Sequence, residues 1–151
     1  MSQSLVQLYV HFVFSTKSRA PFLRDVPFRD CVHAYLAGIC KNVDSRPLRI
    51  GGVEDHVHLL CLLSKTLDVS SFMRDMKRDS TNWIQNNNPH LANFHWQNGY
   101  GAFSVSPSHI DAPVEYIANQ TEQHRQESFQ DEFRRLCQKY GINLDERYAW
   151  H

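Results

Sequence analysis

The sequence predicts a mixed α/β fold of the ferredoxin-like class, a split βαβ sheet with helices on one face. Three observations predict it: an opening segment of β-branched and aromatic residues, two amphipathic helical segments, and two short apolar segments between those helices. The expected order is strand, helix, strand, strand, helix, strand and then further helices, which is the order of a split βαβ unit.

The first strand and the first helix are joined by a polar, basic segment. Residues 4–15 are rich in β-branched and aromatic types, which predicts a strand buried on at least one face. Asp25 then offers an N-cap, and Pro27 suits a first helical turn. Apolar residues follow at helical spacing: Phe28, Val32, Tyr35, Leu36, Ile39 and Val43. Residues 44–47 are turn-forming types and end this helix.

Two strands and a second helix follow. Residues 48–53 predict a short strand that ends in two glycines, and residues 57–63 predict a nearly continuous apolar strand. The second helix starts near Asp68. Its apolar stripe consists of Val69, Phe72, Met73, Met76 and Trp83. Residues 86–89 end it.

The last third of the chain predicts one more strand and two more helices. Residues 90–100 are expected to form a loop, and residues 102–106 a short strand. Asp111 is a candidate cap for a third helix over residues 113–124. A final helix carries Phe129, Phe133, Leu136 and Tyr140 on one face, and Gly141 stops it.

Length and composition indicate one globular domain, residues 1–151. The 16 basic and 16 acidic side chains balance, which excludes a disordered charged chain and a globally basic nucleic-acid binder. We expect no membrane span and no signal peptide, and therefore a cytoplasmic protein, associated with the nucleoid when it acts on DNA. The cysteines are expected to be reduced thiols: Cys31, Cys40, Cys61 and Cys137.

His56 and His58 flank Val57 at the start of a predicted strand. Because strand side chains alternate between faces, the two imidazoles project from the same face and could chelate a divalent metal with a third ligand. On spacing alone, histidines that merely hydrogen-bond to backbone or solvent are the favoured interpretation. Glu54 and Asp55 could ligate the metal, orient an imidazole or be solvated turn residues.

Tyr116 and Gln120 are candidate partners for the histidine pair. They lie four residues apart in a predicted helix and so share a helix face. An amide oxygen can ligate a metal, and a deprotonated phenol is a nucleophile. The alternatives are a packed core tyrosine and a surface amide.

Taken together, these segments resemble the HUH-type single-tyrosine transposases of small bacterial insertion sequences. The resemblance covers essentially the whole chain. It is carried by Glu-Asp-His-Val-His at 54–58, Gly-Tyr-Gly-Ala-Phe-Ser-Val-Ser at 99–106 and Tyr-Ile-Ala-Asn-Gln at 116–120. The opening residues 11–17 and the closing residues 139–142 add to it.

The resemblance implies a substrate, an assembly and a site. The substrate would be single-stranded DNA with a subterminal hairpin, and the protein an obligate homodimer joined edge to edge through its sheets. His56, His58 and Gln120 would be metal ligands, and Tyr116 the nucleophile. In this family the tyrosine helix can come from the other subunit, so each site can be composite.

These residues suit DNA strand transfer. A metal on a non-bridging phosphate oxygen acts as a Lewis acid, and the tyrosine forms a 5′-phosphotyrosine and releases a 3′-hydroxyl. That bond conserves the phosphoester's energy, so no ATP is needed. We expect Mg²⁺ in cells with Mn²⁺ tolerated, because Mg²⁺ prefers oxygen ligands whereas Mn²⁺ accepts nitrogen more readily.

Local basic patches are needed to bind DNA, because the net charge is zero. Arg74, Lys77 and Arg78 share one helix face, and Lys17 and Arg19 form a second patch. For any one of these residues, a solvated surface charge is an equally good interpretation.

Several other functions remain open. A REP-associated tyrosine transposase would use the same chemistry on palindromic repeats. A non-catalytic or domesticated hairpin-DNA-binding protein would lack the chemistry altogether. A metal-dependent hydrolase without a DNA role leaves the basic helix face unexplained, and relaxases and rolling-circle initiators usually need larger domains.

Overall fold

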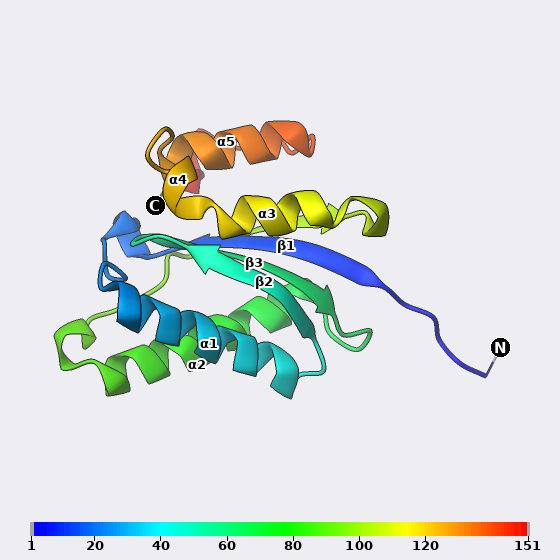
Figure 1. Ribbon diagram of the computed structural model, residues 1–151, viewed down its shortest axis with the longest axis horizontal. Coiled ribbons are helices and arrows are strands. Elements are labelled where there is room, and N and C mark those ends of the chain that lie inside the picture. The colour runs from blue at the N-terminus through cyan, green and yellow to red at the C-terminus, as the bar shows by residue number, and fades with distance from the viewer. Residues whose placement is uncertain (1, 151) are drawn as a thin grey trace.

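The computed structural model describes residues 2–150, in which four antiparallel strands form one sheet (Figure 1). The strands are β1 (Leu8–Ser15), β2 (Arg46–Gly52), β3 (His56–Leu63) and β4 (Gly101–Val105). Their spatial order, β2-β3-β1-β4, is that of a ferredoxin-like sheet, because both helical connections cross over one strand. The predicted fold class is confirmed.

The two long helices, α1 (Val26–Asn42) and α2 (Val69–Asn87), pack side by side against one face of the sheet. Alternate strand residues point to that face and form the main core with the helices. The buried members from β1 and β3 include Phe12, Phe14, Val57 and Leu59. Residues of the opposite parity, which include both histidines of β3, therefore point to the other face.

Helices cover both faces of the sheet, which corrects the expectation of helices on one face. Figure 1 shows α3 (Asp111–Ala118), α4 (Gln120–Gln123) and α5 (Phe129–Lys139) on the face opposite α1 and α2. A second, smaller core joins Val13 and Phe103 of the sheet to Phe129 and Leu136 of α5. The short helix α6 (Glu146–Ala149) follows. The second face carries enough apolar surface to require this cover.

Most predicted elements are present, but several boundaries differ. The strand predicted over residues 48–53, for example, is Arg46–Gly52, and the strand predicted over residues 102–106 is Gly101–Val105. The first strand begins at Leu8, and Asp111 is the first residue of its helix rather than the cap. The predicted helix 113–124 is broken, because Asn119 leaves the helical conformation with φ −103° and ψ 24°. Within residues 2–150, three 3-10 turns join these elements: η1 (Lys17–Arg19), η2 (Pro89–Leu91) and η3 (Pro107–His109).

Gly51 fixes the height of α3 above the sheet. A Cβ atom at this position would lie 2.3 Å from the carbonyl oxygen of Ile117, so only glycine permits this approach of the α3 backbone to β2. Tyr116 precedes Ile117, and its position over the sheet depends on this contact.

Residues 2–150 bear on two expectations, the absence of a membrane-spanning helix and the presence of free cysteines. Within these residues, no helix has both the length and the apolar character to cross a membrane. All four cysteines are free thiols, as expected; Cys31 is exposed and the others are buried.

Candidate active site

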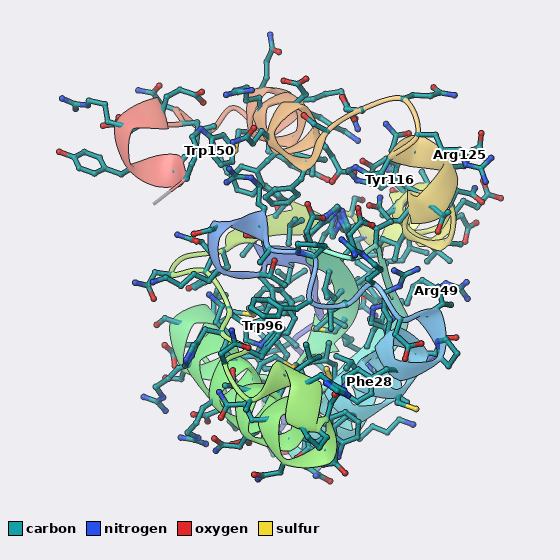
Figure 2. The ribbon with its side chains drawn as sticks, turned by 90° about the vertical axis from the view of Figure 1, so that its left-hand side faces the viewer. Phe28, Arg49, Trp96, Tyr116, Arg125 and Trp150 are labelled. Carbon is teal, nitrogen blue, oxygen red and sulfur yellow. The ribbon has the colours of Figure 1, made fainter. Side chains whose placement is uncertain are left out.

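The histidine pair lies where the strand pattern predicts. His56 and His58 are completely buried, and their ring centroids are 5.2 Å apart on the face of the sheet that carries α3, α4 and α5. Figure 2 places Tyr116 on this side, whereas Phe28 and Trp96 lie on the side of α1 and α2. The pair therefore belongs to the layer between the sheet and the C-terminal helices.

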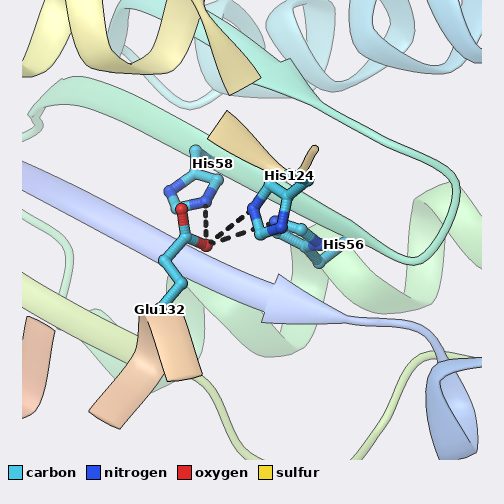
Figure 3. A group of neighbouring side chains, drawn as sticks. All are labelled: His56, His58, His124 and Glu132. Atoms are coloured by element: carbon cyan, nitrogen blue, oxygen red, sulfur yellow. Dashed lines mark hydrogen bonds and ion pairs between the residues drawn. The ribbon is translucent and has the colours of Figure 1, made fainter. Parts of the chain in front are cut away.

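Glu132 of α5 is the centre of the site (Figure 3). Its side chain is completely buried, and its Oε1 lies 2.9 Å from the Nε2 of His58, 3.2 Å from that of His124 and 3.3 Å from that of His56. The four groups offer ligand atoms that all lie within 4.8 Å of one another. Three imidazoles and one carboxylate thus converge on a single point.

Sequence reasoning missed Glu132 and His124. The sequence does contain a pattern that indicates Glu132. This residue lies three residues after Phe129 and four before Leu136, which places a charged group on the apolar face of an amphipathic helix. Such a group is either paired or functional. His124 lies four residues after Gln120, but no local pattern connects it to the histidine pair.

Burial and the neighbouring imidazoles have opposite effects on the pKa of Glu132. Burial raises the pKa of the carboxyl, but hydrogen bonds from His124, His56 and His58 outweigh it and hold the pKa well below its usual range. Burial lowers the pKa of His56, but Asp55 and Glu132 outweigh it and raise this pKa to about 9. Burial lowers the pKa of His58. Glu132 is therefore ionised, and His56 is its main cationic partner.

Two further groups orient the histidine pair. The Nδ1 of His56 lies 2.7 Å from Asp55 Oδ1, so Asp55 has the orienting position that was one of its expected roles. The Nδ1 of His58 lies 2.9 Å from the Nε2 of His11, a buried residue of β1. Burial and then the neighbouring His58 lower the pKa of His11 to about 3, so His11 is neutral and one proton is shared between the two facing nitrogens.

Tyr116 reaches this cluster from its own chain. Its hydroxyl donates to Oε2 of Glu132, and its ring centroid lies 5.8 Å from that of His58. The Nη2 of Arg135 donates to the phenol oxygen at 2.8 Å. Burial, followed by Glu132, raises the pKa of Tyr116 above its usual range, and Arg135 opposes this. One protomer therefore contains both the histidine pair and the tyrosine.

Gln120 also faces the cluster, although the helix is broken between it and Tyr116. Its Oε1 lies 3.2 Å from the Nε2 of His56 and 3.0 Å from that of His124. Its Nε2 donates to Oε2 of Glu132 at 3.2 Å. The four predicted site residues are thus brought together, with Gln120 in contact with both a histidine and the carboxylate.

A cavity of about 540 Å³ opens beside Tyr116, between β4, α3 and α5. Its lining includes Arg135, Lys139, Tyr140 and His109. Two cations and aromatic rings line a space next to the phenol, which is a suitable environment for a nucleotide and its phosphate.

The predicted α2 patch lies on the far side of the sheet from this site. Arg74 and Arg78 form ion pairs with neighbouring aspartates of α2. Lys77 donates to the backbone oxygens of Gln97 and Gly99, and burial lowers its pKa to about 8. Lys77 therefore anchors the loop before β4.

The second predicted patch lies at the histidine end of the sheet. Lys17 and Arg19 belong to the turn η1, which follows β1 directly. The backbone N–H of Thr16 donates to the carbonyl of Asp55 at 2.8 Å, and this ties the turn to the residue before His56.

Known proteins share the family and the fold of this chain. Residues 4–120 match the sequence profile of a protein family described as IS200-like transposases. A candidate transposase from Deinococcus radiodurans R1, known from a crystal structure, is similar with a TM-score of 0.64 and 23% identity, covering 80% of this chain and 98% of its own. A REP-associated tyrosine transposase bound to a REP hairpin gives a TM-score of 0.60 and 17% identity, covering 82% of this chain and 74% of its own. No curated protein sequence matches the chain. At these identities the two structures establish a shared fold.

Proposed function

The chain belongs to the family of IS200-like transposases, and we propose that it cuts and rejoins single-stranded DNA at hairpin-bearing ends through a covalent bond between Tyr116 and a 5′-phosphate. One observation carries the proposal: the Tyr116 hydroxyl and the Nε2 atoms of His56 and His58 meet at the carboxylate of Glu132. A nucleophile and metal-binding imidazoles at one point suit phosphoryl transfer.

The donor groups fit a divalent cation. His56 and His58 would hold it, with Gln120 as a third ligand through the Oε1 that faces His56. When bound, the cation supplies Lewis-acid polarisation of the scissile phosphate. We retain Mg²⁺ as the expected cation in cells and Mn²⁺ as a substitute, with no requirement for ATP.

The strand-transfer step uses the phenol of Tyr116. A bond forms between Oη and phosphorus while the bond between phosphorus and the 3′-oxygen breaks. The phenol loses its proton, and the leaving 3′-oxygen gains one to become a hydroxyl. A 3′-hydroxyl from another strand reverses these steps and joins DNA. Arg135, which donates to Oη at 2.8 Å, stabilises the phenolate as its proton leaves.

The DNA would occupy the cavity beside the tyrosine. Arg135 and Lys139 suit phosphate contacts there, and Lys17 and Arg19 extend positive charge along the same end of the sheet as His56. Binding of a REP hairpin by a protein of the same fold supports a hairpin as the substrate's recognition element.

A homodimer remains part of the proposal. Within residues 2–150, β2 and β4 each pair with one neighbour, so both sheet edges are open to strand pairing with a second copy. Because Tyr116 already lies beside its own histidine pair, the dimer is not needed to assemble this site. Light scattering after gel filtration measures the oligomeric state directly.

The decisive experiment captures the covalent bond. Purified protein is incubated with Mn²⁺ and labelled single-stranded oligonucleotides that carry the hairpins of the DNA flanking its gene. A denaturant-resistant adduct should form, and Tyr116→Phe should abolish it while leaving hairpin binding intact. Tyr140→Phe is the matched control, because Tyr140 lines the same cavity and stacks on Phe103.

One observation favours the non-catalytic hairpin-binding alternative. Glu132 accepts the Tyr116 hydrogen bond and helps raise the phenol's pKa, which keeps the nucleophile protonated in this geometry. A protein of that class would bind the hairpin, including a palindromic repeat, and give no adduct with any divalent cation.

A further inference from the structure

The three histidines around Glu132 are oriented in the same way. Each turns its Nε2 towards Oε1 of that carboxylate and uses its Nδ1 for a partner outside the cluster. The outer partners are Asp55 Oδ1 at 2.7 Å from His56, His11 Nε2 at 2.9 Å from His58, and the Glu127 carbonyl oxygen at 2.8 Å from His124. Metal-ligating histidines characteristically bind a carboxylate, a carbonyl or a similar group through the second nitrogen.

The proton inventory leads to the same conclusion. A carboxylate and a carbonyl only accept hydrogen bonds, so the Nδ1 atoms of His56 and His124 carry protons, and we assign the same tautomer to His58. A neutral imidazole of this tautomer presents a bare lone pair at Nε2. Protons on Nε2 bond these imidazoles to Oε1 of Glu132, and once a cation displaces them, three such lone pairs would face it together with this oxygen, which is also only an acceptor. One proton satisfies one of these three contacts, whereas a central cation satisfies all four donor atoms at once.

We propose that His124 and Glu132 complete a four-ligand site with His56 and His58 for a first-row transition-metal dication. The inference rests on the proposed function, but His124 and Glu132 replace Gln120 as ligands and a transition metal replaces Mg²⁺ as the expected cation. The scissile phosphate would add as a fifth ligand. The Oε1–Nε2 distances of 2.9–3.3 Å approach the ligand spacing of about 3.4 Å in a tetrahedral site. Three nitrogens and one oxygen favour Mn²⁺, Co²⁺ or Zn²⁺ over Mg²⁺, which prefers oxygen.

Glu132 has a second role in this arrangement. Its Oε1 faces the imidazoles, while its Oε2 accepts from the Tyr116 hydroxyl and from Nε2 of Gln120. The carboxylate therefore joins the cation site to the nucleophile and acts on Tyr116 as a positioning residue. Both added ligands, His124 and Glu132, lie beyond residue 120, where the match to the transposase family ends.

Metal binding by the full chain in the absence of DNA tests the proposal. Isothermal titration with Mn²⁺, Zn²⁺ and Mg²⁺ should give at least about tenfold weaker binding for Mg²⁺ than for Mn²⁺. Glu132→Gln and His124→Asn should each weaken Mn²⁺ binding by at least about tenfold. Asp131→Asn is the matched control on α5, because Asp131 is exposed and pairs with Arg134, and it should bind Mn²⁺ as the parent does.

A spectroscopic readout separates ligand loss from misfolding. Four-coordinate Co²⁺ absorbs visible light much more strongly than six-coordinate Co²⁺, so the Co²⁺-loaded parent should be strongly coloured and His124→Asn should not. His124 lies at the rim of the cluster, with a side chain 10% exposed, so its substitution disturbs the core least.

Unchanged Mn²⁺ affinity in both Glu132→Gln and His124→Asn would overturn the proposal. If His56→Asn still weakened Mn²⁺ binding in that case, the proposed function would stand with His56, His58 and Gln120 as the ligands. If His56→Asn also had no effect, the metal part of the proposed function would fall as well. Formation of the Tyr116 adduct is scored separately and does not decide the ligand set.

Discussion

Arg135 donates from its Nη2 to the phenol oxygen of Tyr116 at 2.8 Å, and its guanidinium lies 5.5 Å from the centre of the same ring. A second contact, with Glu127 at 3.0 Å, holds the guanidinium in place. Arg135 favours the phenolate over the phenol more strongly than Gln120 does, and both oppose the effects of burial and Glu132 on the pKa of Tyr116.

Arg135→Ala should therefore slow adduct formation more than it weakens DNA binding. We expect at least about a tenfold lower rate, equivalent to roughly 1.4 kcal/mol, with partial recovery in Arg135→Lys. Rates come from single-turnover cleavage with Mn²⁺, and affinity from fluorescence anisotropy in the presence of a chelator. Arg134→Ala on the outer side of α5 is the control, and equal losses of rate and affinity in Arg135→Ala would assign it to DNA binding alone.

His11 should contribute to metal affinity without touching the metal. With His58 in the tautomer assigned above, the Nε2 of His11 accepts from Nδ1 of His58 and fixes the direction of that imidazole. His11→Ala should weaken Mn²⁺ binding by about 10–100-fold, whereas His11→Gln, which keeps an acceptor, should lose less. Titration calorimetry checks this, with His109→Ala as a histidine control at an exposed position. An unaffected Mn²⁺ affinity in His11→Ala would remove the orienting role.

The two basic patches should contribute unequally to DNA binding. Lys17 and Arg19 lie at the histidine end of the sheet, whereas Arg74 and Arg78 lie under the opposite face and are paired with aspartates. The Lys17→Ala/Arg19→Ala double variant should weaken hairpin binding and lower the salt slope by about one for each lost phosphate contact. The Arg74→Ala/Arg78→Ala double variant should change both less, and the reverse order would place the DNA on α2.

His33 should make the fold sensitive to acid. Burial, followed by Arg29, lowers its pKa from 6.5 to about 4 against the opposing effect of Asp30, and its Nε2 is buried with no hydrogen-bond partner within residues 2–150. Arg49 of β2 lines the same hollow. Between pH 6.5 and pH 4, His33 is protonated in the unfolded state and neutral in the folded state. Its contribution to stability is therefore fully present above pH 6.5 and is lost as the pH falls towards 4.

The size of this effect follows from the linkage relation. The free energy of unfolding should fall by about 1–2 kcal/mol between pH 7 and pH 5 on account of His33, and His33→Gln should flatten this part of the profile. Urea denaturation at each pH measures it. Parallel profiles for the parent and His33→Gln would show that His33 titrates normally.

The parts of the site that lie within single elements could be predicted from the sequence. The period of two in a strand placed His56 and His58 on one face, and the apolar stripes of the two long helices placed the main core. The four-residue interval predicted that the side chains of Tyr116 and Gln120 lie on the same side of the helix. Although the helix is broken at Asn119, both side chains contact the carboxylate of Glu132.

The other parts of the site depend on tertiary packing, which the spacing of apolar residues within one element does not predict. Glu132 joins the site because α5 folds back over the second face of the sheet, onto Val13 and Phe103. His124 caps α4 and meets Glu132 only through this packing. The same packing explains why helices cover both faces. The position of Glu132 on an apolar helix face is the one local sign of this arrangement, and it indicates a buried charge without naming the partners.

The most direct test of the central claim identifies the residue that carries the DNA. Trypsin cleavage after Arg78 and Arg125 releases residues 79–125, which contain both Tyr100 and Tyr116. After reaction with the hairpin oligonucleotide and Mn²⁺ and digestion with nuclease, fragmentation of this peptide in a mass spectrometer should locate the nucleotide on Tyr116. A nucleotide on Tyr100, or on a residue outside this peptide, would contradict the assignment of the nucleophile and the function built on it.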